Sequence, residues 1–250
     1  MIIRDAYRTE NRDSLQDFIA PRPTNTFAPV GHYESAQQIA DILESKNIRI
    51  NKEIHEVSKG GNRLFSKFFV SVPNINTRYE YEFVVGHRNT HDKSAMRGVV
   101  LGKSVVVCKN MCFSGEMKLE NKHTNGVNSG LLVNFDTKIA QNISTLIDGF
   151  SRIHKRVETL KKTEINNDQA NEILVEGFMK DILPASKFTD VVNEYRNPRH
   201  AEFKGNTLWN MENAFTEFFR EVNNPHLLPV KSEHLNRILD KHIPEYAKAA

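Results

Sequence analysis

The period of the hydrophobic pattern changes along this chain, and that change constrains the fold more than any other feature of the sequence. Between Ile48 and Ser114 the pattern follows a period of two, as in "RINKEIHEV". Such alternation is typical of β-strands that bury one face. The segment "SKGGN" follows the first run, and two adjacent glycines favour a tight hairpin. No connection between the runs is long enough for a crossover helix, so we expect four to six strands, mostly antiparallel.

Helical spacing appears on both sides of this region. Upstream, "YESAQQIADILESKN" predicts a helix with Ser35 as a possible N-cap. Downstream, "DTKIAQNISTLIDGFSRIHKRVETLKK" carries one apolar stripe for roughly six turns, with Asp136 as the expected N-cap. Three further helices are expected: "DQANEILVEGFMKDIL" ended by Pro184, "TLWNMENAFTEFFREV" opened by Thr207, and "SEHLNRILDKH" opened by Ser232.

Together these patterns predict an α+β fold, in which a twisted antiparallel sheet is packed by the long helix and followed by a helical C-terminal half. Residues 1–30 hold three prolines within nine positions and are expected to form an extended N-terminal arm. Residues 31–135 would be the mainly β part with its one N-terminal helix, and residues 136–250 the helical part. We expect the two parts to form one domain.

Composition narrows the class of protein. Hydrophobic residues at 39% and charged residues at 26% are ordinary for a soluble globular protein. The charged start of the sequence favours no signal peptide, and no apolar run approaches the roughly 20 residues that span a bilayer. Cys108 and Cys112 would lie roughly 13 Å apart on a strand, which is too far for a disulfide. We therefore expect free thiols and a cytoplasmic protein.

A dense polar segment, "GHRNTHDKSAMRG" at residues 86–98, stands directly before an apolar strand. Binding groups often lie in loops at strand ends. Between Gly86 and Gly126 there are seven basic and three acidic residues, a local charge of +4 in a chain whose net charge is +3. We expect a nucleic-acid interface in which cations contact phosphates while Asn89 and His91 shape the loop. The expected cations are Arg88, Lys93, Arg97, Lys103 and Lys109, extended by Arg196 and Arg199 of the basic segment "NEYRNPRHAEFKGN".

Other interpretations of these residues stay open. Zinc takes His and Cys ligands, but the spacing of His87, His91, Cys108, Cys112 and His123 matches no common zinc motif. Asp92 could instead pair with Arg88 or Arg97 and simply hold the hairpin together. No nucleophile elbow and no Walker loop is present. We therefore predict no catalytic residue, metal or cofactor, although the sequence leaves an enzyme possible.

Two blocks resemble a phage- and plasmid-borne family catalogued as domain of unknown function 932. "RNTHDKSAMRGVVLGKSVVVCKN" is similar to its main block and "LWNMENAFTEFF" to a later one, and the resemblance covers roughly residues 30 to 222. Met111 stands where the pattern leads us to expect glycine. Besides Arg88 and Asn89, the resemblance draws attention to Asp92, Ser94, Cys108, Asn110, Trp209, Asn213 and Thr216.

The resemblance implies an origin in a phage or mobile element and a role in its DNA metabolism. A sheet followed by a long helix is also similar, by analogy of fold alone, to phage single-strand annealing proteins. We therefore expect a DNA-binding protein that prefers single strands and acts in replication or recombination in a bacterial cytoplasm, with self-association possible and no membrane partner. Two alternatives stay open: a phage protein that binds a host protein, and a metal-dependent nuclease.

Overall fold

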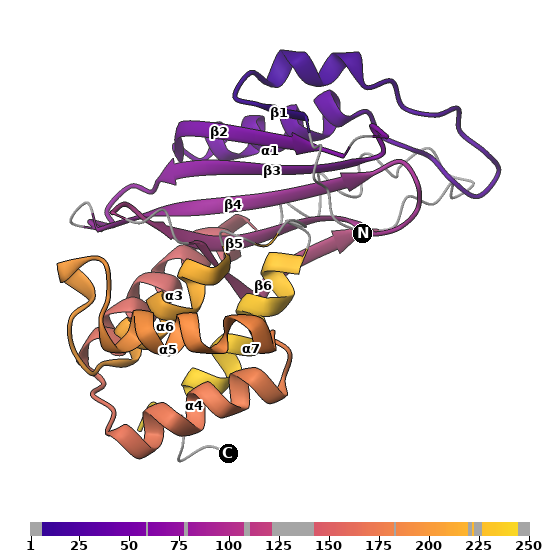
Figure 1. Cartoon of the computed structure of the whole chain (residues 1–250). Helices are drawn as coiled ribbons and strands as arrows, with labels where there is room; N and C mark the ends of the chain where they lie inside the picture. Colours follow the sequence, from indigo (N-terminus) through magenta and orange to yellow (C-terminus); the bar gives the residue numbers. More distant parts are fainter. Residues whose placement is uncertain are drawn as a thin grey trace.

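One antiparallel sheet forms the centre of the molecule. The computed structural model describes residues 7–58, 60–77, 80–107, 111–121, 143–182, 184–219, 222 and 227–244. Six strands pair in chain order, so each strand lies beside its neighbours in the sequence (Figure 1). The predicted antiparallel sheet is confirmed. The strands are β1 (Tyr7–Thr9), β2 (Arg49–Val57), β3 (Arg63–Ser71), β4 (Tyr81–Thr90), β5 (Arg97–Val105) and β6 (Met111–Asn121).

Helices make up the C-terminal half of the described chain, which confirms the predicted α+β class (Figure 1). None of the helices in the described ranges is long and apolar enough to cross a membrane. The α-helices are α1 (His32–Ser45), α3 (Ile143–Lys162), α4 (Asn167–Met179), α5 (Phe188–Arg196), α6 (Leu208–Phe219) and α7 (Leu228–Asp240). The short 3-10 helices are η1 (Arg12–Asp17), η2 (Ala185–Lys187) and η3 (Ala201–Phe203).

Helices α1 and α3 pack on the same face of the sheet. Tyr81, Phe83 and His87 point to one face, because side chains at alternate positions of a strand share a face. The ring of Phe83 lies 4.8 Å from that of Phe150 in α3, between centroids. The imidazole of His87 lies 2.8 Å from the hydroxyl of Ser35 in α1. The predicted long helix therefore covers this face in its described part, whereas the expected N-cap at residue 136 lies outside the described residues.

The opposite face of the sheet holds an aromatic contact over two glycines. Phe65 and Phe113 are both buried, and their rings meet edge to face with centroids 6.0 Å apart. A Cβ atom at Gly86 would lie 2.9 Å from the ring of Phe113, and one at Gly102 would lie 2.5 Å from the carbonyl oxygen of Cys112. Both strands therefore need glycine here, because the edge strand and its phenylalanine approach too closely for a side chain.

The N-terminal residues are more ordered than the predicted extended arm. Within residues 7–30 the chain forms β1 and η1, and Leu15 of η1 is fully buried. Arg12 donates two hydrogen bonds to the carboxylate of Glu53 in β2, at 2.7 and 2.9 Å. Glu10 forms a second, more exposed ion pair with Lys52 of β2. These contacts hold the segment against the sheet.

Two predicted N-caps are wrong by about one turn. Helix α1 begins at His32, after Gly31, so Ser35 lies inside the helix, where its hydroxyl bonds His87 instead of capping. Helix α7 begins at Leu228, and Ser232 is buried within it.

Candidate functional site

The end of β4 holds the start of α1 against the sheet. Asn89 is fully buried, and its amide nitrogen donates to the carbonyl oxygen of Val30 at 2.8 Å. The same nitrogen lies 3.0 Å from Nδ1 of His32. The imidazole of His91 lies 2.9 Å from the Val30 carbonyl and stacks on His32, with ring centroids 3.9 Å apart. Asn89 and His91 therefore contribute to an internal docking contact.

The cations of this turn also bind groups of the protein itself. Arg97 is 3% exposed, and its guanidinium donates to the carbonyl of Ser35 and to the side chain of Gln38. Arg88 donates from Nε to the carbonyl of Met96 at 2.8 Å, and burial lowers its pKa. Lys93 is exposed, with its ammonium 5.0 Å from the ring centroid of Phe27. Asn89, His91 and Arg97 are thus engaged inside the protein, and a nucleic acid could reach them only if this region opened.

Asp92 has a different partner from the two considered above. Its carboxylate accepts a hydrogen bond from Nε of Arg63 in β3 at 2.7 Å, not from Arg88 or Arg97. The other oxygen accepts from the backbone of Ser94 at 3.0 Å. Asp92 therefore links the β4–β5 turn to the neighbouring strand, and Ser94 closes a local turn.

Histidine burial at this end of the sheet makes a pH dependence of stability predictable. Burial lowers the pKa of His87 well below its usual value, helped by the charge of Arg97, and burial also lowers the pKa of His91. Because the unfolded chain then binds more protons, stability should be full well above pH 6.5 and should fall over the interval below about pH 6.5, by up to about 1.4 kcal/mol per pH unit for each histidine. Urea unfolding across this interval measures the slope. His87→Gln should lower the slope of stability against pH by the amount that corresponds to about one proton. An unchanged slope in that variant would show that His87 does not cause the pH dependence.

Two further predicted basic residues, Arg196 and Arg199, belong to the helical half of the protein. Arg196 ends α5 and is exposed, and Arg199 follows it. The guanidinium of Arg199 binds the carboxylates of Glu194 at 2.8 Å and Glu217 at 2.7 Å. Helix α5 packs on other helices of the C-terminal half, whereas Arg88 lies near the end of β4 and Lys93 in the turn that follows it. The structure therefore does not join the predicted cations into one surface.

Helix α6 carries the later family block, and all three of its highlighted residues are buried. Trp209 is 7% exposed, and Asn213 and Thr216 are 2% exposed. Asn213 donates to the carbonyl of Trp209 at 2.8 Å, and Thr216 donates to the carbonyl of Asn213 at 3.3 Å. The earlier block is only partly described, since Cys108, Lys109 and Asn110 lie outside the described residues.

A buried ion pair supports Trp209 from the sheet. Lys103 of β5 lies 2.8 Å from the carboxylate of Glu212, with 5% and 2% of the two side chains exposed. Its ammonium is 5.5 Å from the ring centroid of Trp209. The ammonium of Lys103 is thus engaged inside the protein and is not available to a phosphate. Burial, together with the charge of Glu212, raises the pKa of the adjacent Cys112 thiol to about 11, which keeps it protonated at neutral pH.

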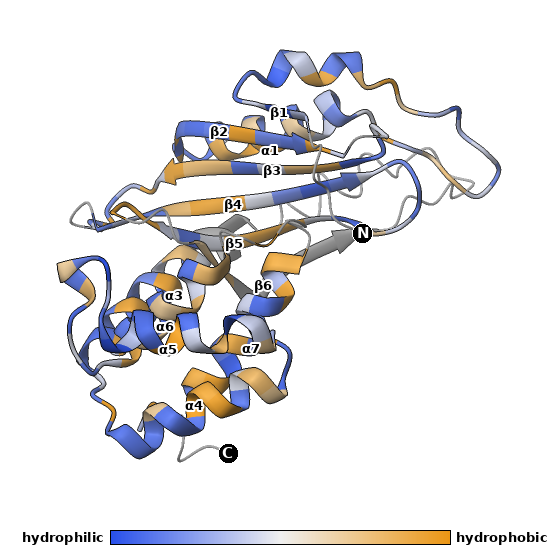
Figure 2. Ribbon diagram, viewed as in Figure 1, coloured by the Kyte–Doolittle hydropathy of each residue, from blue (hydrophilic) through white to orange (hydrophobic). Residues whose placement is uncertain are grey.

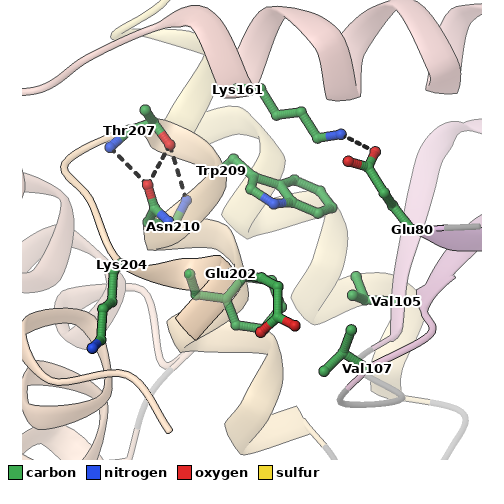
Figure 3. A pocket seen from close by; sticks show the side chains of 10 residues that line it. Glu80, Val105, Val107, Lys161, Glu202, Lys204, Thr207, Trp209 and Asn210 are labelled. Atoms are coloured by element: carbon green, nitrogen blue, oxygen red, sulfur yellow. Dashed lines mark hydrogen bonds and ion pairs between the residues drawn. The ribbon is translucent and has the colours of Figure 1, made fainter. Parts of the chain in front are cut away.

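Beside this ion pair a cavity of about 310 Å³ opens between the sheet and the helical half (Figure 3). Lys161, near the end of α3, pairs with Glu80, and its ammonium is 5.5 Å from the ring centroid of Trp209. Within the described residues, neither Glu202 nor Lys204 forms an ion pair, although both line the cavity and are exposed. We call this cavity the Trp209 pocket. Its lining residues are Glu80, Val105, Val107, Lys161, Glu202, Phe203, Lys204, Thr207, Trp209 and Asn210.

One wall of the Trp209 pocket is the start of α6, which a reciprocal cap holds in place. The amide oxygen of Asn210 accepts from the backbone nitrogen of Thr207 at 3.0 Å. In return the hydroxyl of Thr207 accepts from the backbone nitrogen of Asn210 at 3.3 Å. This confirms the predicted helix start at Thr207 and leaves the cap residues satisfied (Figure 3).

Helix α3 presents a basic outer face that the sequence reasoning missed. Arg152, Lys155 and Lys162 are all exposed, and spacings of three and seven residues place them on one side of the helix. The segment "RIHKRVETLKK" holds five Lys or Arg residues against one acid. This excess of positive charge indicates a basic face. The apolar stripe of the same helix, however, led us to predict only a packing role for it.

The described residues contain no group of three or more His, Cys, Asp or Glu side chains placed to hold a metal ion. His87 instead bonds Ser35 and the carbonyl of Gly98, at 2.8 and 3.0 Å. Cys108 and His123, which complete the set considered for zinc, lie outside the described residues.

Fold and site together define an α+β protein in which a six-stranded antiparallel sheet meets a helical half at a pocket of mixed charge. A family model described as "Domain of unknown function (DUF932)" matches residues 23–242. The chain belongs to this family, which confirms the resemblance of its two sequence blocks. No curated protein and no solved structure matches the sequence.

Proposed function

We propose that this protein binds nucleic acid, preferentially single-stranded DNA, in the DNA metabolism of a phage or other mobile element. The observation that carries the proposal is the exposed basic face of α3, on the helix whose last turn lines the Trp209 pocket. The resemblance to phage- and plasmid-borne proteins supports the biological setting, a bacterial cytoplasm.

The chemistry of this helix suits a phosphate backbone. In the part of the chain that the structure describes, neither Lys155 nor Lys162 forms an ion pair, so both ammonium groups are available to solvent. Cations of this kind release counterions when they neutralise phosphates, which gives affinity without sequence preference. The pocket favours single strands, because a base can enter a concave site only when it is unpaired.

Replacing Lys155 and Lys162 by glutamine should weaken the binding of a single-stranded oligonucleotide and flatten its salt dependence. Each lost phosphate contact removes about 0.7 from the slope of log K against log salt, so the double variant should lose about 1.4. Fluorescence anisotropy of labelled single- and double-stranded oligonucleotides across a salt series measures both quantities.

Lys46→Gln/Lys180→Gln provides the matched control, since both lysines are exposed on other elements. This variant changes net charge equally and should leave the slope nearly unaltered. Equal effects of the two double variants would argue for diffuse attraction. Absence of binding at low salt by the unchanged protein would end the proposal.

A second candidate function is the binding of a host protein, favoured by exposed apolar residues late in α4. Val175, Phe178 and Met179 are 54%, 40% and 71% exposed. Figure 2 shows that the second half of this helix is mostly hydrophobic in sequence. Apolar side chains gathered in this way are typical of protein-binding surfaces. A lack of salt-dependent DNA affinity would make this the leading candidate.

A further inference from the structure

We infer that the Trp209 pocket receives one nucleobase that carries an amino group, with the attached phosphate at Lys204. The inference rests on the proposed function and deepens it, because it names what the site distinguishes. The base could belong to a bound strand or to a free nucleotide, and the experiment below separates these two sources.

Size limits the occupant to a single base with part of its sugar. A volume of about 310 Å³ lies at the lower end of the range for small-molecule sites. The rings of Trp209 and Phe203 and the side chains of Val105 and Val107 supply an apolar lining. Such a lining suits a flat aromatic group, and contact with aromatic side chains is how proteins commonly hold unpaired bases.

Some polar side chains of the pocket already have partners within the protein, and others are available to a ligand. Lys161 pairs with Glu80, and Thr207 and Asn210 cap α6. The carboxylate of Glu202 and the ammonium of Lys204 have no ion pair among the described residues. Figure 3 shows both residues on the segment that precedes α6, with the ammonium of Lys204 pointing away from Trp209, where a phosphate outside the cavity would lie.

These two groups predict a preference among bases. A carboxylate accepts hydrogen bonds from the amino groups of cytosine, adenine or guanine, whereas thymine has no amino group. A lysine ammonium attracts the phosphate of any nucleotide without distinguishing the base. Glu202 should therefore determine the preference, and Lys204 should contribute equally to all four.

The wall that a base would contact is held rigidly. Lys103 and Lys161 each place an ammonium 5.5 Å from the ring centroid of Trp209. The buried pair with Glu212 fixes Lys103 in turn. A ligand-contacting side chain that is held by further packed and ion-paired residues keeps its position when a ligand binds.

The experiment uses the intrinsic fluorescence of Trp209, the single tryptophan of the chain. Titration with the deoxynucleoside monophosphates should change its emission saturably, about tenfold more tightly for the three amino bases than for thymidine monophosphate. Glu202→Gln should remove most of this preference, and Lys204→Gln should weaken all four nucleotides alike. Glu172→Gln, at an exposed position of α4, is the matched control and should change neither property.

Oligonucleotides with and without bases separate this inference from the proposed function. An oligomer of deoxycytidine should bind and change the emission, and an abasic oligomer of equal length should bind, by anisotropy, without changing it. If both bind and no nucleotide or oligomer alters the emission, strand binding stands and the pocket inference is overturned. If nucleotides alter the emission and neither oligomer binds, the pocket takes free nucleotides and strand binding fails. Equal affinity for thymidine monophosphate and the other three monophosphates would contradict the proposal that the pocket recognises the amino group of the base.

Discussion

Replacing Glu212 by alanine is expected to lower the free energy of unfolding by about 3–5 kcal/mol, because the change leaves the ammonium of Lys103 buried without its partner. Both side chains are almost wholly inaccessible to water, at 5% and 2% exposure. Urea unfolding followed by tryptophan fluorescence measures the loss, and Trp209 lies close enough to Lys103 to report on it.

The control for this prediction removes both charges. Lys103→Met/Glu212→Leu should recover much of the lost stability, since an apolar pair of similar size avoids the desolvation penalty. Asp190→Ala breaks the partly exposed pair with Lys187 and should alter stability by about 1 kcal/mol or less. A similarly small loss for Glu212→Ala would show that water reaches Lys103.

Alanine at Gly102 is expected to destabilise the protein by about 2–3 kcal/mol or to prevent folding. The added Cβ would lie 2.5 Å from the carbonyl oxygen of Cys112 and 2.7 Å from the ring of Phe113. The first of these atoms belongs to the backbone of a paired strand, so relief requires β5 and β6 to separate. Thermal and urea unfolding provide the measurement.

Gly60→Ala is the matched comparison, because its new methyl group would find nothing closer than 3.4 Å, the side-chain nitrogen of Asn62. This variant should unfold almost like the unchanged protein. If Gly102→Ala behaved in the same way, the close approach of β6 over β5 would be wrong.

The antiparallel sheet and most of the helices could be predicted from sequence because each has a strong internal period. The stripe that includes Phe150, Ile153 and Val157 identified α3, and the alternation after residue 48 identified the strands. Helix α5 was missed, although Phe188, Val191 and Tyr195 follow helical spacing. It is short, and its polar residues and the nearby prolines resemble a loop.

The candidate site was harder to predict, because charge counted along the chain says nothing about partners. Lys103 contributed to the basic excess, yet its counter-charge, Glu212, lies 109 positions away in the sequence. Asn89 and His91 bond Val30, about sixty positions earlier. The Trp209 pocket combines residues from four separate stretches of chain, so no local motif could reveal it.

The order of the strands in the sheet has a consequence for how the chain folds. From β2 to β6 each strand pairs with the next one in the sequence across a short connection, whereas β1 pairs with β2 across residues 10–48. Contacts between the sheet and the helical half close much longer loops of chain. The ion pair of Lys103 with Glu212, for example, joins residues 109 positions apart. Closing a long loop loses more chain entropy than closing a short one. Strands β2 to β6 can thus assemble early and locally, and the packing of α6 and α7 onto β6 then joins the helical half to the sheet.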